Sequence, residues 1–368
     1  LVREAATWLN ATGKKLINHY QTSFYHLFDR LLDAGKRNPK FFQSSIVSNK
    51  NKIDWVSVAI NSPVSPLLQS LFHDLRLDTD KKKTPVDWLA RVSNVLQLGD
   101  DNSKYALVIC NHNLGWFYAR EANWTRANLL SARESIDPEV RRAFWSGFFW
   151  GAKVPSPELY RELRESLLTY VQGIEFTNEG HSKVLAGILL SGWRSIDQTT
   201  EKPYIVNDEF REFLVKCDDE YRAHVLWQIR VWSTQNGGNR EWKDQSIKLL
   251  TDVWPKQIVA KSPATTIRLC ELAFSDNYLF EKLAKLVLPH LVKLDSRNMR
   301  LPIIRGRKDQ IIQSNPELVL TIIFKILPDE VRDWPYQVNE VFDSIEEASP
   351  DLKYDERMIE IKRKWNSR

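Results

Sequence analysis

Residues 219–232 read DEYRAHVLWQIRVW, and the spacing of the apolar side chains in this stretch decides the fold class. Tyr221, Val225, Ile229 and Trp232 recur at intervals of four, four and three residues. These intervals match the 3.6-residue turn of an α-helix, so the four side chains form one stripe that faces a core. The same period recurs along most of the chain, which predicts an all-α fold.

Helix starts are marked by a polar residue that is followed by proline. The polar side chain can accept a hydrogen bond from a free N–H of the first turn, and proline fits the first helical position because no donor is needed there. Thr84 with Asp87 also resembles an acidic variant of the capping box. Five such pairs predict helix N-termini: Thr84-Pro85, Asp137-Pro138, Ser156-Pro157, Ser262-Pro263 and Asn315-Pro316.

Periodicity and start signals together place helices along almost the whole chain. Strand signals are confined to the short apolar runs 107–110 and 204–206, and the first of these also fits inside a helix. The expected helices are 14–34, 63–76, 85–98, 103–121, 122–133, 138–150, 157–172, 178–196, 208–217, 219–234, 240–254, 263–274, 276–292, 316–326, 336–347 and 354–364.

The composition agrees with helices rather than strands. The 368 residues include only 13 Gly and 16 Pro, and a fold built from β-hairpins would need more Gly in its turns. Fourteen Trp supply large rings that fill the spaces between packed helices. The spacing of Trp145, Phe148, Phe149 and Trp150 puts at least three rings on one side of a helix, where we expect them to be buried.

A weak repeat appears in the second half of the chain. Val253-Trp254-Pro255, Val287-Leu288-Pro289 and Ile326-Leu327-Pro328 follow one another at intervals of 34 and 39 residues. Such periods are typical of stacked helical hairpins, and the tetratricopeptide consensus is absent. We therefore expect an irregular HEAT-like, α-solenoid-like array at 201–368 after an N-terminal helical region at 1–200, or one continuous array.

Signatures of catalysis are missing from the sequence. It contains no G-x-G-x-x-G, P-loop, H-E-x-x-H or G-x-S-x-G motif. His19 and His26 can share a helix face, but no carboxylate accompanies them at metal-binding spacing. Cys110 and His112 are two residues apart and point in different directions on a helix. We therefore predict no catalytic residue, no cofactor and no metal site.

One segment concentrates positive charge and is the candidate partner-binding site. No acidic residue lies between Asp295 and Asp309. Such a segment can be solvated, can contact an acidic protein surface, or can bind nucleic-acid phosphates. The net charge of only +5 favours a protein over nucleic acid as the partner. The basic residues are Arg297, Arg300, Arg305, Arg307 and Lys308.

Cysteine usage and hydropathy indicate a cytoplasmic location. Cys110, Cys217 and Cys270 are far apart, and an odd, sparse set fits free thiols in a reducing compartment. No run of about 18 apolar residues predicts a membrane span. The chain begins at Leu1, which suggests a piece of a longer protein.

Four short stretches stand out: Asp54-Trp55 with Ala59-Ile60-Asn61-Ser62-Pro63, Trp124-Thr125, Trp145-Ser146-Gly147-Phe148-Phe149-Trp150-Gly151, and the ending from Pro350-Asp351 through Tyr354-Asp355-Glu356-Arg357 to Trp365. They resemble landmarks of a helical family found in the C-terminal part of large bacterial anti-phage proteins. In that family an N-terminal sirtuin-like domain hydrolyses NAD. Its catalytic Asn and His belong to the sirtuin-like domain, for which this sequence has no counterpart, so the resemblance carries over no catalytic residue.

The sequence and the resemblance together lead to one expected function and two alternatives. We expect a non-catalytic sensor or scaffold region of a multidomain defence protein, which binds its own effector domain, another protomer or a phage protein. The first alternative is a nucleic-acid-binding helical scaffold that uses the basic segment. The second is an all-helical enzyme with an unfamiliar site, which a deep pocket lined by converging polar groups would favour.

Overall fold

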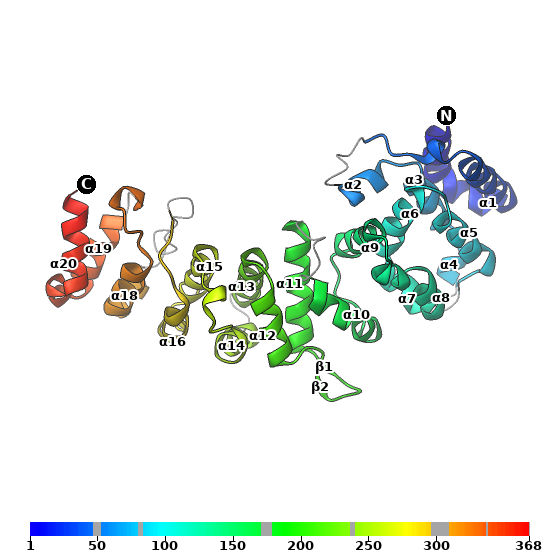
Figure 1. Cartoon of the computed structure of the whole chain (residues 1–368). Coiled ribbons are helices and arrows are strands. Elements are labelled where there is room, and N and C mark those ends of the chain that lie inside the picture. Colours follow the sequence, from blue (N-terminus) through cyan, green and yellow to red (C-terminus); the bar gives the residue numbers. More distant parts are fainter. Residues whose placement is uncertain are drawn as a thin grey trace. The chain divides into compact units, whose positions relative to one another are not determined.

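A computed structural model describes residues 1–46, 53–79, 84–170, 179–235, 240–295, 309–335 and 338–367 (Figure 1). Within these ranges, the only strands are β1 (Ile196–Asp197) and β2 (Lys202–Pro203), which pair antiparallel with Ile196 opposite Pro203. The other regular elements are helices. The predicted all-α fold is therefore confirmed.

The chain divides into two compact units, Leu1–Ser166 and Leu167–Arg368. The division falls within α10 (Pro157–Thr169). The boundary expected between residues 200 and 201 lies inside the second unit, in the turn that joins β1 to β2.

The first unit is built around α6, which contacts α2, α3, α5 and α9. Every residue from Tyr105 to Asn111 is buried. Because neighbours cover α6 on all sides, its apolar run 107–110 needs no polar face and is helical rather than extended. The elements of this unit are α1 (Val2–Arg37), η1 (Pro39–Phe42), α2 (Trp55–Ile60), α3 (Val64–Leu71), α4 (Arg76–Thr79), α5 (Val86–Leu96), α6 (Asn102–His112), α7 (Leu114–Arg120), α8 (Ala122–Asn128), η2 (Leu130–Glu134), α9 (Pro138–Trp150) and most of α10.

Aromatic side chains fill much of this core. Phe72, Trp88, Trp116 and Phe117 form one cluster in which neighbouring ring centroids lie 5.1–6.1 Å apart. The buried indole N–H of Trp88 donates to the carbonyl oxygen of Leu71 at 2.8 Å, so its polar atom is satisfied. On α9, three of the four rings that were expected to face one side, those of Trp145, Phe148 and Phe149, are buried.

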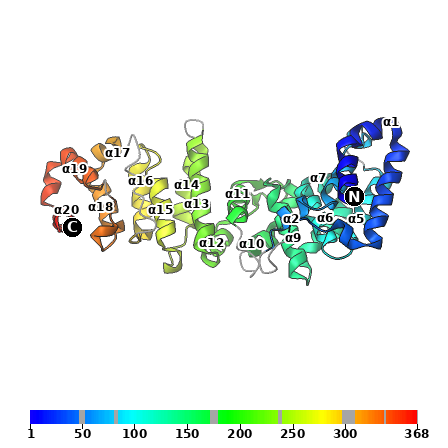
Figure 2. The same cartoon turned by 90° about the horizontal axis from the view of Figure 1, so that it is seen from above.

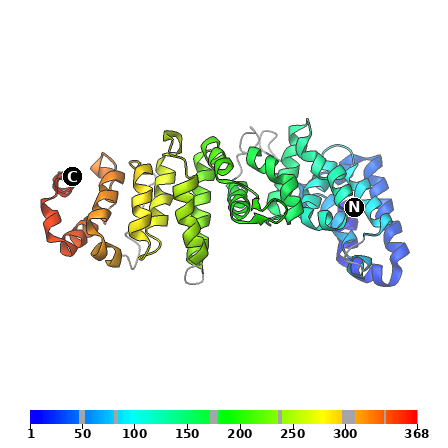
Figure 3. The ribbon, with the colours of Figure 1, turned by 90° about the horizontal axis from the view of Figure 1, so that it is seen from below.

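The second unit consists of helices in two rows. In one row α13 contacts α11 and α15, and α17 contacts α19; in the other, α12, η5, α16, α18 and α20 contact one another in that order. Figures 2 and 3 show these helices following one another in chain order. The bounds are α11 (Glu179–Arg194), α12 (Asn207–Lys216), α13 (Asp219–Thr234), α14 (Arg240–Lys248), the π-helical turn η5 (Leu249–Val253), η6 (Ile258–Ala260), α15 (Pro263–Ala273), α16 (Phe280–Val287), η7 (Leu288–His290), α17 (Asp309–Ser314), α18 (Pro316–Ile326), η10 (Val331–Asp333), α19 (Val338–Ala348), η11 (Pro350–Tyr354) and α20 (Glu356–Asn366).

Polar contacts join helices that are far apart in the sequence of the second unit. In each contact the two residues are about 30 to 50 positions apart in the sequence, so the contact joins one pair of helices to the next. The three prolines of the weak repeat, Pro255, Pro289 and Pro328, each lie two residues after the end of a helix, and these helices, η5, α16 and α18, share one row. The bridging pairs are Arg194–Glu241, Lys243–Asp276, Asn277–Gln310 and Lys293–Asp329.

Four of the five predicted helix starts are confirmed, because α9, α10, α15 and α18 begin at the proline of the pair, and α5 begins one residue later than expected, at Val86. Asp137, Ser156 and Ser262 accept hydrogen bonds from the first turns of their helices. The hydroxyl of Thr84 does not, and it has no hydrogen-bond partner among the described residues. The side chain of Asn315 makes no capping hydrogen bond at the start of α18.

Several predicted helices differ in extent from the structure, and α17 was not predicted; two of the differences are informative. The helix expected at 103–121 is broken at Asn113, whose φ of −107° and ψ of 21° separate α6 from α7. The helix expected at 14–34 extends from Val2 to Arg37, with a kink at Tyr20. Neither Pro nor Gly stands at the break or at the kink, so the sequence carried no local signal for them.

Candidate functional sites

The predicted partner-binding residues Arg297, Arg300, Arg305, Arg307 and Lys308 lie outside the residues that the structure describes. Their role as a partner-binding site stays a prediction. The described residues offer two pockets and one buried polar cluster as further candidates.

The larger pocket, here called the His112 pocket, lies within the first unit and has a volume of about 160 Å³. The turn between α6 and α7 forms one wall. The end of α9 and the start of α10 form the other. Its lining residues are Asn111, His112, Asn113, Leu114, Gly115, Trp116, Phe148, Gly151, Lys153, Val154, Pro155, Ser156 and Leu159.

Two glycines bring α9 against the end of α6 and so shape the back of the pocket. A Cβ atom on Gly147 would lie 2.4 Å from the carbonyl oxygen of Val108, and one on Gly151 would lie 3.0 Å from that of His112. These neighbours are backbone atoms, which cannot move aside as a side chain can. Glycine at these two positions therefore permits the close packing of α9 on α6.

His112 lies at the end of α6 and stacks on Trp150. The two ring centroids are 4.0 Å apart, with an angle of 36° between the ring planes. Burial, followed by the positive charge of Lys153, lowers the pKa of His112 below its usual value, so the imidazole is neutral at neutral pH. Its Nδ1 atom is buried and has no hydrogen-bond partner among the described residues.

Asn111 is the most unusual residue of the pocket. Its side chain is 1% exposed, and neither the amide nitrogen nor the amide oxygen has a partner in the described part of the chain. A buried carboxamide that makes no hydrogen bond costs about 1–3 kcal/mol. The nitrogen and the oxygen of this carboxamide are themselves buried, on the side of α6 that packs against Gly147 of α9.

The pocket is positively charged. No Asp or Glu is among its lining residues. Lys153 is exposed at the rim and forms no ion pair with any described residue. Such an ammonium attracts a carboxylate or a phosphate.

Cys110 does not act with His112 as a nucleophile. Its side chain is 2% exposed, and burial raises the pKa of its thiol, which keeps the thiol protonated. Cys217 and Cys270 are also buried and free. These positions fit the interpretation of the cysteines as core residues.

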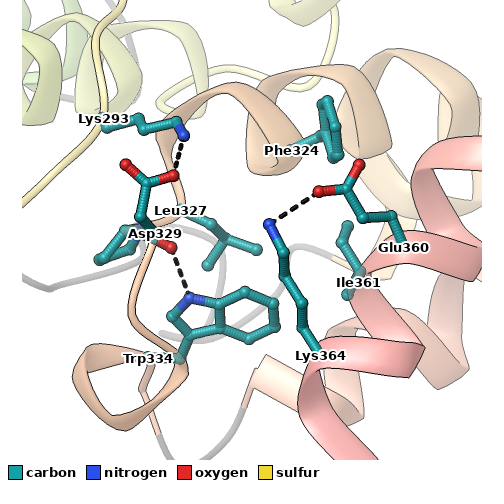
Figure 4. A pocket seen from close by; sticks show the side chains of 9 residues that line it. Lys293, Phe324, Leu327, Asp329, Trp334, Glu360, Ile361 and Lys364 are labelled. Carbon is teal, nitrogen blue, oxygen red and sulfur yellow. Dashed lines mark hydrogen bonds and ion pairs between the residues drawn. The ribbon is translucent and has the colours of Figure 1, made fainter.

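A second, smaller pocket of about 70 Å³ lies near the end of the second unit (Figure 4). Lys293 pairs with Asp329, and the Nζ atom of Lys364 lies 2.7 Å from Glu360. The indole of Trp334 forms another wall and donates its N–H to the carbonyl oxygen of Pro328 at 2.8 Å. These polar groups already have partners within the protein. They are therefore less available to a ligand than Lys153 of the His112 pocket, which forms no ion pair with any described residue.

The polar cluster of α11 and α13 resembles a catalytic triad in composition but not in arrangement. The Ser182 hydroxyl lies 2.7 Å from Nδ1 of His224 and donates to Glu220 at 2.9 Å. In a triad the carboxylate orients the histidine, whereas here it binds the serine. Ser182 is also fully buried, out of reach of a substrate. The cluster therefore joins two helices.

The described residues contain neither a candidate metal site nor a candidate membrane-spanning helix. No group of three or more His, Cys, Asp or Glu side chains there lies close enough to hold a metal ion. None of the described helices is both long and apolar enough to cross a membrane.

Sequence reasoning considered His112 but missed Asn111 and Lys153. A lone Asn at the end of a helix and an exposed Lys in a loop are ordinary in sequence. Only the contact of α6 with α9 brings residues 111 and 153 to one pocket. The one available signal was the pair of glycines at 147 and 151, which marks a close helix contact.

Comparisons of this chain with models of protein families, with characterised proteins and with solved structures found no match. The resemblance to the helical region of anti-phage proteins therefore stays a prediction.

Proposed function

We propose that this chain is a non-catalytic helical region that binds other proteins, with a second unit built as an irregular HEAT-like array. The observation that carries the proposal is the arrangement of that unit in two rows, in which α13 contacts α11 and α15 while α16 contacts η5 and α18. In solenoids each repeat contacts its neighbours in the same manner, and the stacked rows present extended faces to partners.

The contacts between successive parts of the rows support this interpretation. The Nε atom of Arg194 on α11 donates to Glu241 on α14 at 2.8 Å, and Lys243 on α14 lies 2.5 Å from Asp276, which follows α15. The first pair is largely exposed, and such pairs contribute little to stability, about 0–1 kcal/mol, whereas the second is partly buried. Their value lies in fixing how one helical pair is placed on the next.

The family resemblance supplies the biological part of the proposal. The chain belongs to a multidomain, cytoplasmic anti-phage protein and binds its own effector domain, another protomer or a phage protein. A trigger activates such a protein only if it binds the active state more tightly than the inactive one. The unit that binds the trigger therefore changes which state is populated without performing chemistry.

Nucleic-acid binding through Arg297–Lys308 is the alternative function. The observation that favours it is the run of basic residues without an intervening acid. The net charge of +5 on 368 residues is small for a protein that binds nucleic acid, so it favours a protein partner.

Sedimentation velocity of the purified chain tests the proposal. The chain is mixed in turn with the effector domain of the parent protein, with phage proteins and with duplex DNA or RNA, each at about 50 and 200 mM salt. We expect a protein complex that persists at the higher salt and no stable nucleic-acid complex. Tight nucleic-acid binding without a protein partner, or NAD hydrolysis that is lost on substituting a residue of this chain, would contradict the proposal.

A further inference from the structure

We propose that two copies of this chain bind each other through two surfaces of the second unit, a basic one here called the lysine edge and an acidic one on α19 here called the acidic face. The inference rests on the proposed function and deepens it, because it names one partner of the helical array and the surfaces that meet. The lysine edge consists of Lys256, Lys261 and Lys325 with Ile258 and Val259, and the acidic face consists of Glu340, Asp343 and Glu347.

The lysine edge lies where the chain crosses from one row of helices to the other. The backbone N–H of Val292, after η7, donates at 3.0 Å to the hydroxyl of Thr266 in the first turns of α15. The N–H of Leu294 donates at 2.8 Å to the carbonyl oxygen of Ile326, the last residue of α18. One short segment therefore bonds to the start of α15 and to the end of α18, and the lysines next to these two helix ends share one edge.

Three lysines surround His290 at this edge. Burial, followed by the charges of Lys261, Lys256 and Lys325, lowers the pKa of His290, so the three ammonium groups lie near the imidazole. No acidic side chain of the described residues contributes to this shift. None of the three lysines forms an ion pair with a described residue. The edge therefore carries positive charge that the described protein does not compensate.

Two exposed apolar side chains lie among these lysines. Ile258 is 86% exposed and Val259 is 52% exposed, on the turn η6 between Lys256 and Lys261. The N–H of Lys261 donates to the carbonyl oxygen of Ile258 at 2.9 Å, which fixes this turn beside the lysine. A partner that covers the two side chains removes apolar surface from water. The edge thus has an apolar centre and a charged rim, as protein interfaces do.

The complementary surface is present on the same chain. Glu340, Asp343 and Glu347 are spaced by three and four residues, so they form one stripe along α19. All three are exposed, and none forms an ion pair with a described residue. No Lys or Arg lies between Arg332 and Lys353. The stripe therefore offers three unpaired carboxylates to three unpaired ammonium groups.

A second copy of the chain is the partner that this complementarity favours. Within one molecule α18 packs on α19, yet no described ion pair joins the lysine edge to the acidic face. Between two molecules the same groups meet without any change of fold. Opposite charges across an interface speed association and fix the register of the two partners. Because two different surfaces meet, the contact is heterologous, and each copy keeps one further surface for another copy.

Sedimentation velocity of the whole chain tests this contact through reversal of charge on either surface. Lys256→Glu with Lys325→Glu reverses the lysine edge, and Asp343→Lys with Glu347→Lys reverses the acidic face. Each double variant alone brings like charges together, so its association constant should lie at least about tenfold below that of the wild type. An equimolar mixture of the two variants opposes unlike charges again at both surfaces and should associate as the wild type does.

A matched control separates this contact from a general effect of net charge. Lys202→Glu with Lys282→Glu makes the same change of charge at exposed lysines elsewhere in the second unit and should leave self-association unchanged. Self-association of the wild type should weaken between about 50 and 200 mM salt, because salt screens exposed charges. Circular dichroism should show unchanged melting of every variant, since surface substitutions leave the core intact.

The proposal is overturned if the wild-type chain stays monomeric at submillimolar concentration and low salt. It is also overturned if each double variant is monomeric and their mixture does not associate, because the two surfaces then bind different partners. A monomeric wild type that binds duplex DNA or anionic vesicles, with binding lost on reversal of the lysine edge, would assign that edge to phosphates instead. None of these results decides whether the array binds an effector domain or a phage protein, so the proposed function is tested separately.

Discussion

At the scale of single residues, the buried polar groups of the first unit are of two kinds. The carboxylate of Asp74 accepts hydrogen bonds from the guanidinium of Arg76, and Tyr25 contributes a further one. Burial raises the pKa of Asp74, but these hydrogen bonds outweigh it, so the pKa lies below its usual value. This group is satisfied by the protein itself. The carboxamide of Asn111 has no such partner among the described residues, so it does not gain the stability that a hydrogen bond gives.

The aromatic side chains of α9 allow a direct test of packing. Phe149 is 2% exposed, so Phe149→Ala removes a buried ring and should lower the free energy of unfolding by about 3–5 kcal/mol. Ile136→Ala in the same unit removes a side chain that is 98% exposed and should change it by less than about 0.5 kcal/mol. Urea unfolding followed by circular dichroism measures both. Equal effects of the two changes would show that the α9 rings are not core residues.

A buried histidine in the second unit predicts how stability depends on pH. His290 is 6% exposed, and burial, followed by the charges of Lys261, Lys256 and Lys325, lowers its pKa to about 4. In the unfolded chain the pKa is about 6.5. As pH falls below 6.5 the unfolded state takes up a proton before the folded state does, so stability is full above that pH and falls until about pH 4.

The expected loss from His290 between pH 7.5 and pH 5 is about 2 kcal/mol in the free energy of unfolding. The carboxylates remain largely ionised over this interval, so the change in the free energy of unfolding comes mainly from the histidines. His290→Gln does not titrate there, so its stability should change less than that of the wild type when urea unfolding is repeated at the two pH values. Parallel pH profiles for the two proteins would contradict the assignment.

At the scale of elements, the crossing of α6 and α9 depends on Gly147. The Cβ atom of Gly147→Ala would lie 2.4 Å from a backbone oxygen of α6, so the helices must move apart, which should cost about 1–3 kcal/mol or more. Gly115→Ala is the matched control, because nothing lies within 4 Å of its Cβ position on α7. Since alanine favours helix by about 0.8–1 kcal/mol over glycine, the control should be neutral or stabilising. Thermal unfolding that ranks the two variants the other way would exclude the close crossing.

The sequence predicted elements well where the signal was local. The 3.6-residue period and the Asp137-Pro138 and Ser262-Pro263 starts identified helices that the structure contains. The break at Asn113 was not predicted, because Asn113 itself is neither Gly nor Pro and apolar residues continue on both sides of it. Thr84 does not cap α5, because that helix begins at Val86 and Pro85 takes the N-cap position.

The His112 pocket could not be predicted from the sequence. Asn111 lies next to the last residue of α6, and Lys153 lies in the loop after α9. Nothing in the spacing of the two residues indicates that they line one pocket. Only the contact between α6 and α9 brings them together, and that contact exists only in three dimensions.

At the scale of the whole molecule, the two units differ in what they contain. The His112 pocket belongs to the first unit, and the proposed helical array makes up the second. The basic segment at 297–308 lies outside the described residues, so it is part of neither the pocket nor the described helical array. The prediction that this segment binds a partner rests on its charge alone. A change of its charge is therefore the appropriate test.

Arg305→Glu with Arg307→Glu changes the charge of this segment by about four units and leaves the apolar helix stripes untouched, so folding should survive. We expect the double variant to lose a protein partner while nucleic-acid affinity stays unchanged and low, because the net charge of the chain is small. If the segment bound a phosphate backbone, affinity for DNA or RNA would fall whatever the sequence, and the slope of log affinity against log salt would flatten by roughly one to two units. Fluorescence anisotropy with labelled duplexes at several salt concentrations measures that slope. Tight, salt-sensitive nucleic-acid binding by the wild-type chain, abolished in the double variant, would reverse the order of the two functions.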